Sequence, residues 1–182
     1  MELVNRAARN RGEYRRMSLY TWAACAAASI AAVALLFTAW LFAVRAGDAG
    51  MAPTVEQNDV ILFDRLSKTF RTPRRGDIVA FTGSLGEGVY LGRVVGLPGE
   101  TVTIRAGDVY INGLRLDEPY AAGDCADMES AVVREGCFFV MPDQREQADC
   151  AAANNLTVSA RRILGRALAR VWPWERTSLF VE

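Results

Sequence analysis

Histidine is absent from this 182-residue sequence, and its single lysine is Lys68. Without an imidazole the chain cannot build a Ser-His-Asp or Cys-His relay, an imidazole-ligated metal site or a histidine switch near neutral pH. A hydroxyl nucleophile could still be activated by a lysine that burial keeps neutral, and Lys68 is the candidate. Its neighbours Arg65, Ser67 and Arg71 favour an exposed loop lysine instead, so we predict no catalytic role for Lys68.

Net charge is also absent, because 21 basic residues balance 21 acidic ones. No tract rich in Lys and Arg occurs outside the N-terminal tail, so we expect no nucleic-acid partner. At this length the chain has room for one compact domain with a core of its own.

A long apolar run is the main feature of the N-terminal region. No charged residue occurs from Met17 to Val44, and the run exceeds the ~20 residues that a membrane-spanning helix needs. Arginines dominate residues 1–16, which places that tail in the cytoplasm by the positive-inside rule. We therefore predict a cytoplasmic tail (1–16), a transmembrane helix (17–44) and an extracytoplasmic domain (45–182) in the cell membrane. A cleaved secretory signal is the alternative, although the run is longer than the usual apolar region of such signals.

The four cysteines give no metal-ligand spacing, and we expect no metal and no cofactor. Cys25 lies inside the predicted membrane helix. The other three lie on the predicted outer side, where disulfides persist, so one bridge and one free thiol is the simplest arrangement. Cys125 with Cys137 is the favoured pair, over either pairing with Cys150.

Short β-branched runs separated by turn residues fill the rest of the chain, which predicts a mainly β, antiparallel fold. The runs cover residues 60–63, 78–81, 89–91, 94–97, 101–104, 109–111 and 137–141. Asn112-Gly113 predicts a tight hairpin turn. We expect an extended loop or small insertion over about 117–134, and either a short helix or a strand over 160–172.

Four sequence blocks follow one another in this domain: Gly50-Met-Ala-Pro-Thr, Arg75-Gly-Asp-Ile-Val, Tyr90-Leu-Gly-Arg-Val-Val-Gly-Leu-Pro-Gly-Glu, and Phe138-Phe-Val-Met-Pro-Asp-Gln-Arg with Asp149 behind it. In this order, behind an N-terminal anchor, they resemble the boxes of the bacterial type I signal peptidase family (S26). The resemblance runs from the anchor to Pro173. It implies a signal-peptidase-like β domain with a serine nucleophile in the first box and a neutral lysine base in the third.

Both catalytic residues that the resemblance implies are missing here. Gly50 stands where the family has the serine, and Gly92 where it has the lysine. Glycine has no side chain for either role, and Arg93 stays protonated and cannot serve as a base. The fourth block is also eroded, with Asp149 as its residual acidic residue. Cys150 could be a relocated nucleophile, but it lacks a nearby base and Asp149 would oppose its ionisation.

A groove that pairs an extended peptide as an added strand needs no nucleophile, so binding can outlast cleavage. The resemblance suggests Met51, Ala52, Pro53 and Val94 as groove residues, with core packing as the alternative for Val94. We therefore predict a membrane-anchored, catalytically inactive homologue that binds or assembles exported proteins. Family members without the Ser/Lys pair suggest pilin subunits and a sortase as partners. The alternatives are a signal peptidase that cleaves secretory precursors, and a regulatory subunit of an active one.

Overall fold

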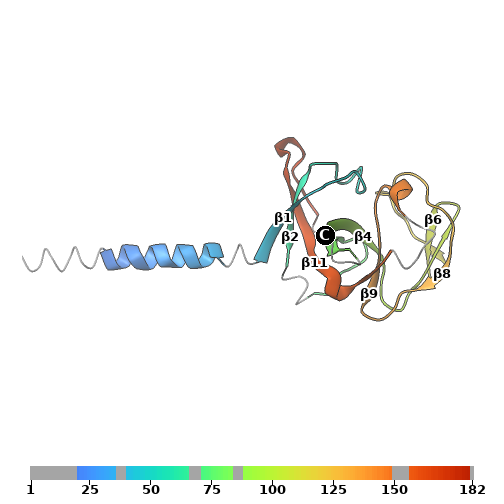
Figure 1. The fold of residues 1–182 in the computed structure, drawn as a ribbon, viewed down its shortest axis with the longest axis horizontal. Coiled ribbons are helices and arrows are strands. Elements are labelled where there is room, and N and C mark those ends of the chain that lie inside the picture. The colour runs from blue at the N-terminus through green and yellow to red at the C-terminus, as the bar shows by residue number, and fades with distance from the viewer. Residues whose placement is uncertain (1–19, 36–39, 66–70, 84–87, 149–155, 181–182) are drawn as a thin grey trace, which may run out of the picture. The chain divides into compact units, whose positions relative to one another are not determined.

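The computed structural model describes residues 20–35, 40–65, 71–83, 88–148 and 156–180. The chain divides into two compact units, Met1–Trp40 and Leu41–Glu182. The first contains a helix over residues 20–35, drawn in blue in Figure 1. Among the residues that the structure describes, no helix has the length and apolar character needed to cross a membrane. Met17 and residues 36–39 of the predicted span lie outside the described ranges.

The predicted C-terminal end of the membrane helix is wrong. Leu41–Arg45 form strand β1, which pairs antiparallel with β2, Val60–Asp64. The apolar run continues from the helix into this strand, so composition alone does not mark where one ends and the other begins. The second unit therefore starts inside the run that hydropathy assigns to the membrane.

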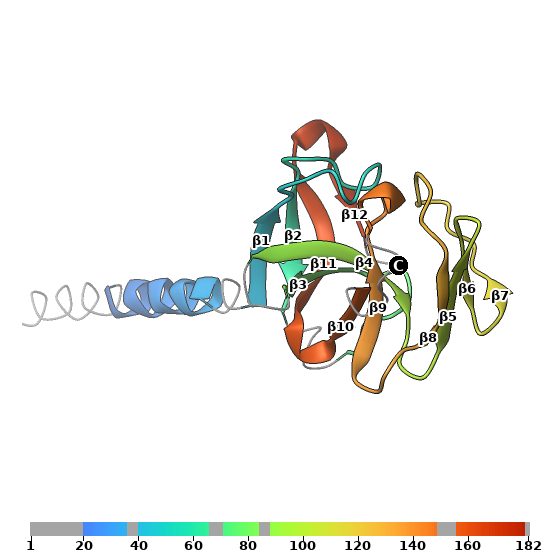
Figure 2. The same cartoon turned by 45° about the vertical axis from the view of Figure 1, so that its right-hand side comes forward.

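The second unit is a mainly antiparallel β domain of two sheets (Figures 1 and 2). The larger has the order β1-β2-β11-β3-β4-β9-β10, with β12 also paired to β11, and the smaller has the order β7-β6-β5-β8. The remaining bounds are β3 Ile78–Thr82, β4 Val89–Gly96, β5 Thr101–Arg105, β6 Asp108–Ile111, β7 Leu114–Arg115, β8 Met128–Val132, β9 Cys137–Met141, β10 Thr157–Ser159, β11 Ile163–Trp172 and β12 Ser178–Leu179, with 3-10 turns η1 Arg145–Gln147, η2 Ala160–Arg162 and η3 Trp174–Arg176.

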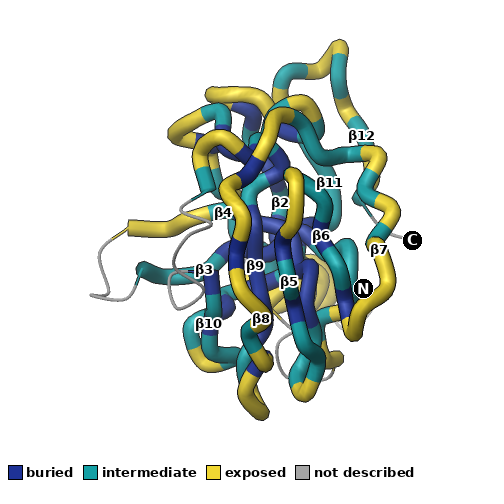
Figure 3. Tube along the Cα trace, turned by 90° about the vertical axis from the view of Figure 1, so that its right-hand side faces the viewer, coloured by how far each residue is buried: buried dark blue, intermediate teal, exposed yellow. Residues whose placement is uncertain are grey.

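Alternating burial explains why these runs form strands. In β2, β5 and β6 every second residue is buried, as expected for strands with one face on the core. β9 is buried along nearly its whole length, because it lies between β4 and β10 and also contributes to the core under the smaller sheet. Figure 3 shows the partly buried β5 and the mostly buried β9 beside the exposed β7.

The turn predictions have mixed outcomes. Asn112 and Gly113 have φ of 52° and 84° and connect the paired residues Ile111 and Leu114, which confirms the two-residue hairpin. Residues 160–172 form η2 and then β11, so the strand alternative is correct for most of them. The expected loop over 117–134 contains a strand, β8, which pairs with β5. In its Met-Glu-Ser-Ala-Val sequence the apolar residues do not alternate with polar ones.

Candidate functional site

Gly50 lies in the loop between β1 and β2, held at both of its peptide groups. Its N–H donates to Asp48 Oδ1 at 2.9 Å, and its carbonyl accepts from the N–H of Gln144 at 2.9 Å. A Cβ built at this position would lie 3.0 Å from Asp48 Oδ1 and 3.2 Å from Gln147 Oε1. Both atoms are the ends of flexible side chains, so a small side chain at position 50 could be admitted by a modest adjustment.

Gly92 lies in the middle of β4, opposite Val79 of β3. A Cβ at position 92 would lie 2.5 Å from Val140 Cγ1, 3.3 Å from Phe81 Cε1 and 3.4 Å from the carbonyl oxygen of Met141. These atoms belong to packed core residues and to a strand backbone. The space beside Gly92 is therefore already occupied by neighbouring strands.

Both glycines face the same stretch of chain, the end of β9 and the turn η1 that follows it. Gly92 meets Val140 and Met141 of β9, whereas Gly50 is bonded to Gln144 and faces Gln147. The fold thus brings the first and third sequence blocks onto the fourth. Their roles as former nucleophile and base positions rest on the resemblance and remain a prediction.

Next to Gly92, a buried ion pair joins β4 to the segment after β9. Arg93 donates from Nε to Asp143 Oδ1 at 2.8 Å and from Nη2 to Asp143 Oδ2 at 2.6 Å, a two-point contact. It also donates to the Gly76 carbonyl at 2.9 Å. Asp143 is fully buried and additionally accepts the hydroxyl proton of Thr54 at 2.6 Å. This cluster ties the first, second, third and fourth sequence blocks together.

Tyr120, Glu118 and Arg145 extend this cluster. The Arg93 guanidinium lies 3.9 Å from the ring centre of Tyr120, and the Tyr120 hydroxyl donates to Glu118 at 2.9 Å. Burial, together with the negative charge of Glu118 and the bond to it, raises the pKa of Tyr120. Glu118 also pairs with Arg145 at 2.6 Å, and Arg145 is 2% exposed.

The hydroxyl and the carboxylate of this cluster are bound to each other and to a guanidinium. Thr54 donates to Asp143, and Arg93 already occupies both oxygens of Asp143. Lys68, Asp149 and Cys150 lie outside the described residues. Within the described ranges, no group of three or more Cys, Asp or Glu side chains could hold a metal ion.

The predicted groove residues divide between core and surface. Met51 is 2% exposed and packs with Ile61 and Phe63, and Val94 is fully buried in another cluster. The structure therefore places both in the core, as the alternative for Val94 anticipated. Ala52 is partly exposed and Pro53 is exposed, so a groove role remains a prediction for these two.

The predicted disulfide between Cys125 and Cys137 is wrong. Cys125 is bonded in a disulfide, whereas Cys137 carries a free thiol. Cys137 opens β9 and is fixed opposite Ser159 of β10, whereas Cys125 belongs to the segment that leads into β8 of the smaller sheet. Both cysteines border the core cluster under the smaller sheet, and spacing in the sequence does not reveal which thiols come within bonding distance there.

Sequence reasoning missed the buried charge cluster. It treated Arg93 only as a residue that cannot be a base, and it did not pair it with Asp143. A signal was available for Arg93, because it is an isolated charge inside an apolar β block and buried charges in proteins are paired. Asp143 gave a weaker signal, because it follows β9 next to other charged residues. Tyr120 and Glu118 gave no such signal, since they lie in a segment predicted as an irregular loop.

The chain is similar in sequence to known proteins of one family. Residues 19–172 match the family described as signal peptidase, peptidase S26. The chain is 33% identical to the probable signal peptidase I-2 of Synechocystis sp. over 74% of this chain and 64% of that protein. It is 36% identical to signal peptidase I of Leptolyngbya laminosa over 69% of this chain and 66% of that protein.

A longer match has lower identity. Signal peptidase I of Bacillus licheniformis is 26% identical over 88% of this chain and 92% of that protein. A solved structure of a signal peptidase I from Enterococcus faecalis shares 30% identity, with a TM-score of 0.46, and covers 52% of this chain and 96% of that one. The chain spans slightly less than two thirds of the Synechocystis and Leptolyngbya proteins.

Proposed function

Because this chain belongs to the signal peptidase family, peptidase S26, we propose that it uses the family's β domain to bind exported peptides and does not cleave them. Met51-Ala-Pro-Thr and the blocks around Arg75, Arg93 and Asp143 keep the framework of the family resemblance. The two positions that would carry the chemistry are glycines.

The closed packing at Gly92 is the observation that carries this proposal. A lysine base would need a side chain that leaves β4 at this position, and the first atom of any side chain would overlap Val140 Cγ1 at 2.5 Å. Real Cβ atoms do not approach a neighbouring carbon that closely, since packed interiors have no spare volume. The neighbouring strands fill the space that a side chain at position 92 would need, which supports a binding role without a lysine base.

The nucleophile position supports the same reading less strongly. Gly50 offers no hydroxyl, and Asp48 already accepts its N–H. Nearby Thr54 donates its proton to a carboxylate that a guanidinium neutralises. No histidine exists anywhere in the sequence to replace the base.

Binding of an extended peptide remains possible without these groups, because added-strand pairing relies on backbone donors and acceptors. Under this proposal the chain is anchored by its N-terminal apolar run and presents the β domain outside the cytoplasm. Exported proteins are its ligands, with pilin subunits and a sortase as the specific partners that the family resemblance suggests.

A second candidate function is the cleavage of signal peptides, and the names of the relatives favour it. The Synechocystis protein is named a probable signal peptidase and the Leptolyngbya protein a signal peptidase. For this chain to act in the same way, a nucleophile and a base would have to come from residues other than Gly50 and Gly92.

The test uses the full chain in detergent with a synthetic signal-sequence peptide that carries a fluorophore. Mass spectrometry follows cleavage, and fluorescence anisotropy follows binding. We expect binding without cleavage. Cleavage by the wild-type chain that scales with its concentration would overturn the proposal and support the second candidate.

Two leucine variants locate the binding. Gly50→Leu places a side chain beside Gln147, whereas Gly47→Leu adds the same side chain where nothing lies within 4 Å. If the peptide passes the first block, Gly50→Leu weakens binding by about tenfold or more, which is ~1.4 kcal/mol, and Gly47→Leu leaves it unchanged. Equal effects of the two substitutions would contradict a peptide site at Gly50.

A further inference from the structure

The segment that leads into β3 carries two exposed guanidinium groups. Arg71 and Arg74 are both exposed. Among the described residues, neither guanidinium has a hydrogen bond or an acidic partner; the contact of Arg74 with Asp77 at 2.8 Å uses its backbone N–H. Other arginines of this face are paired, Arg75 with Glu100 and Arg93 with Asp143.

Two cavities meet at this segment and share Arg74 and Asp77 in their walls. The smaller has a volume of about 20 Å³ and is bordered by Arg71, Arg166 and apolar groups that include Val79. The larger, of about 580 Å³, is bordered by Tyr120, Leu179 and Phe180 as well as arginines. In the smaller cavity Arg71, Arg74 and Arg166 face Asp77 as the one acidic residue among the described lining residues, so positive charge is in excess there.

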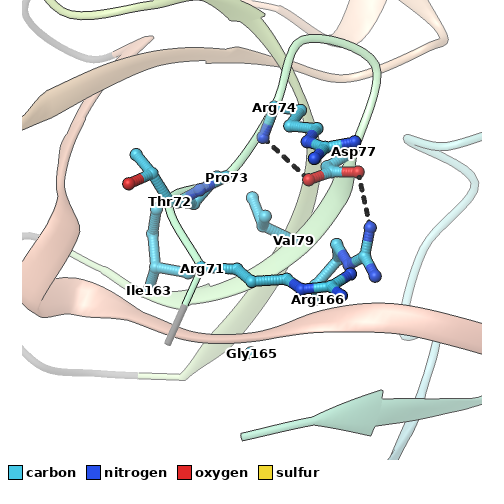
Figure 4. A pocket seen from close by; sticks show the side chains of 9 residues that line it. All are labelled: Arg71, Thr72, Pro73, Arg74, Asp77, Val79, Ile163, Gly165 and Arg166. Atoms are coloured by element: carbon cyan, nitrogen blue, oxygen red, sulfur yellow. Dashed lines mark hydrogen bonds and ion pairs between the residues drawn. The ribbon is translucent and has the colours of Figure 1, made fainter. Parts of the chain in front are cut away.

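The single negative charge of Asp77 offsets only one of these guanidiniums, and both of its oxygens already accept hydrogen bonds. Oδ2 accepts the N–H of Arg74, and Oδ1 accepts from Arg166 Nη1 at 3.3 Å, a long contact for an ion pair. Figure 4 shows Asp77 between these two partners at the rim of the smaller cavity. An additional anion would face little competition from it.

Arg166 supplies an unused donor at this place. Its Nε–H is buried and has no hydrogen-bond partner, although its side chain borders the smaller cavity. A buried donor without an acceptor is unfavourable, and a ligand oxygen bonded to it would remove that cost. A guanidinium presents its donors in a planar fork that suits a carboxylate.

We propose that this surface, bordered by Arg71, Arg74 and Arg166, binds an acidic peptide segment of a partner protein. A carboxylate side chain enters the smaller cavity, and a neighbouring apolar side chain of the same peptide rests in the larger one against Leu179 and Phe180. The smaller cavity has room for about one water-sized group, which fits the head of a carboxylate better than a bulkier phosphate. The apolar wall of the larger cavity likewise suits a peptide.

This site uses residues other than Gly50 and Gly92, so it stands whether or not the chain cleaves peptides. The test titrates the full chain in detergent with fluorescent peptides that alternate Asp and Leu, and with matched peptides that alternate Asn and Leu. We expect the acidic peptide to bind about tenfold more tightly. Raising the salt from about 50 mM to about 300 mM should reduce that difference, because exposed charges are screened.

Matched variants separate a site from a general charge effect. Arg71→Gln/Arg74→Gln removes the two unpaired guanidiniums, and we expect it to lose about tenfold in affinity for the acidic peptide. Arg105→Gln/Arg134→Gln removes the same charge from exposed arginines elsewhere and should bind as wild type does. Equal losses in the two double variants would overturn the proposal.

Two further outcomes would also overturn it. One is equal affinity for the Asp and Asn peptides. The other is competition by inorganic phosphate, or by vesicles with anionic headgroups, that displaces the acidic peptide at concentrations where acetate does not. In that case the surface selects phosphate and not the carboxylates of a protein.

Arg166→Lys tests the unused donor directly, because it keeps the charge and removes the planar fork. We expect a severalfold loss of affinity with the melting temperature close to that of wild type. Unchanged affinity would show that the buried Nε–H takes no part in binding.

Discussion

Gly50 and Gly92 stand at two motif positions of one family, yet their surroundings differ. Around Gly50 the nearest atoms to a built Cβ are the ends of the Asp48 and Gln147 side chains, at 3.0 and 3.2 Å. Around Gly92 they include a core valine at 2.5 Å and a strand carbonyl at 3.4 Å. One position is a loop that can adjust, and the other is a sheet interior that cannot.

The difference indicates at which of the two family positions a side chain could be introduced more easily. Gly50→Ser requires only the exposed side chains of Asp48 and Gln147 to move. Gly92→Lys requires Val140 to move, and β4 and β9 are held in register by Arg93 opposite Met141 and Val94 opposite Val140. The packing around Gly92 is therefore the larger obstacle to a side chain at either position.

The largest expected effect comes from removing the charge of Arg93, the neighbour of Gly92 in β4. Arg93→Met leaves Asp143, which is fully buried, without its two-point partner. A buried charge that loses its partner costs about 3–5 kcal/mol. We expect a loss of that size in the free energy of unfolding, measured by urea denaturation of the full chain in detergent.

An exposed ion pair serves as the control. Arg115 pairs with Asp108, and their side chains are 67% and 39% exposed. Arg115→Met should cost far less than Arg93→Met, because water screens such a pair. Equal losses in the two variants would mean that the Arg93 pair does not stabilise the contact between β4 and the segment after β9.

The second prediction concerns the packing at Gly92. Gly92→Ala adds one carbon where Val140 leaves no space, and overpacking of this kind costs about 1–3 kcal/mol. Val140→Ala alone loses core packing. Combined with Gly92→Ala, it should recover part of the loss, because the added carbon then fills the space that was vacated.

A double-mutant cycle in urea measures this coupling. Additive losses in the double variant would show that Val140 is not the obstacle, and the contrast between the two glycines would lose its physical basis. Activity plays no part in this measurement, so it remains informative whatever the chain does with peptides.

The fold was predictable to a large extent because alternation is a local signal. The runs over 60–63, 78–81, 101–104 and 137–141 are all strands, and the two separate runs 89–91 and 94–97 form most of one strand, β4. Leu41–Arg45 was not recognised as a strand because it belongs to one uninterrupted apolar run of the sequence. β8 was not recognised because its apolar residues do not alternate with polar ones.

The site was predictable only as motif positions. That Gly50 and Gly92 lack side chains follows from the sequence, but the overlap with Val140 depends on how strands far apart in the sequence are aligned. The same holds for the pair of Arg93 with Asp143, which are 50 residues apart. The excess of charge around Arg74 also needed the fold, because Arg166 of β11 comes from a distant part of the chain.

The ring of Tyr120, which lies against the guanidinium of Arg93, gives a pH-dependent test of the packing beside Gly92. Burial and Glu118 raise its pKa in the folded chain, while the unfolded value lies near 10. Above about pH 10 the unfolded state loses this proton and the folded state keeps it, so stability falls as pH rises, and below that range this group contributes no pH dependence. Since the phenol is only partly buried, we expect a total of about 1 kcal/mol.

Urea denaturation near pH 9 and near pH 11 measures this loss. Tyr120→Phe should remove the extra alkaline decline, apart from a constant offset for the lost bond to Glu118. Tyr90→Phe changes a half-exposed ring and controls for the loss of any one phenol. The same alkaline decline in wild type and Tyr120→Phe would show that the phenol over Arg93 is not protected.

The smallest effect is expected at Gly50 and at its control position, Gly47. Gly50→Ala meets only the flexible ends of Asp48 and Gln147, and Gly47→Ala meets nothing within 4 Å. We expect Gly47→Ala, at an exposed position, to change the free energy of unfolding by less than about 0.5 kcal/mol. Gly50 is buried, so Gly50→Ala should cost somewhat more, but less than the ~1–3 kcal/mol expected for Gly92→Ala. A cost at Gly50 as large as that at Gly92 would mean that its bond to Gln144 is as rigid as the sheet. The first block would then be closed by packing too, and restoring a serine there would be no easier than restoring a lysine in β4.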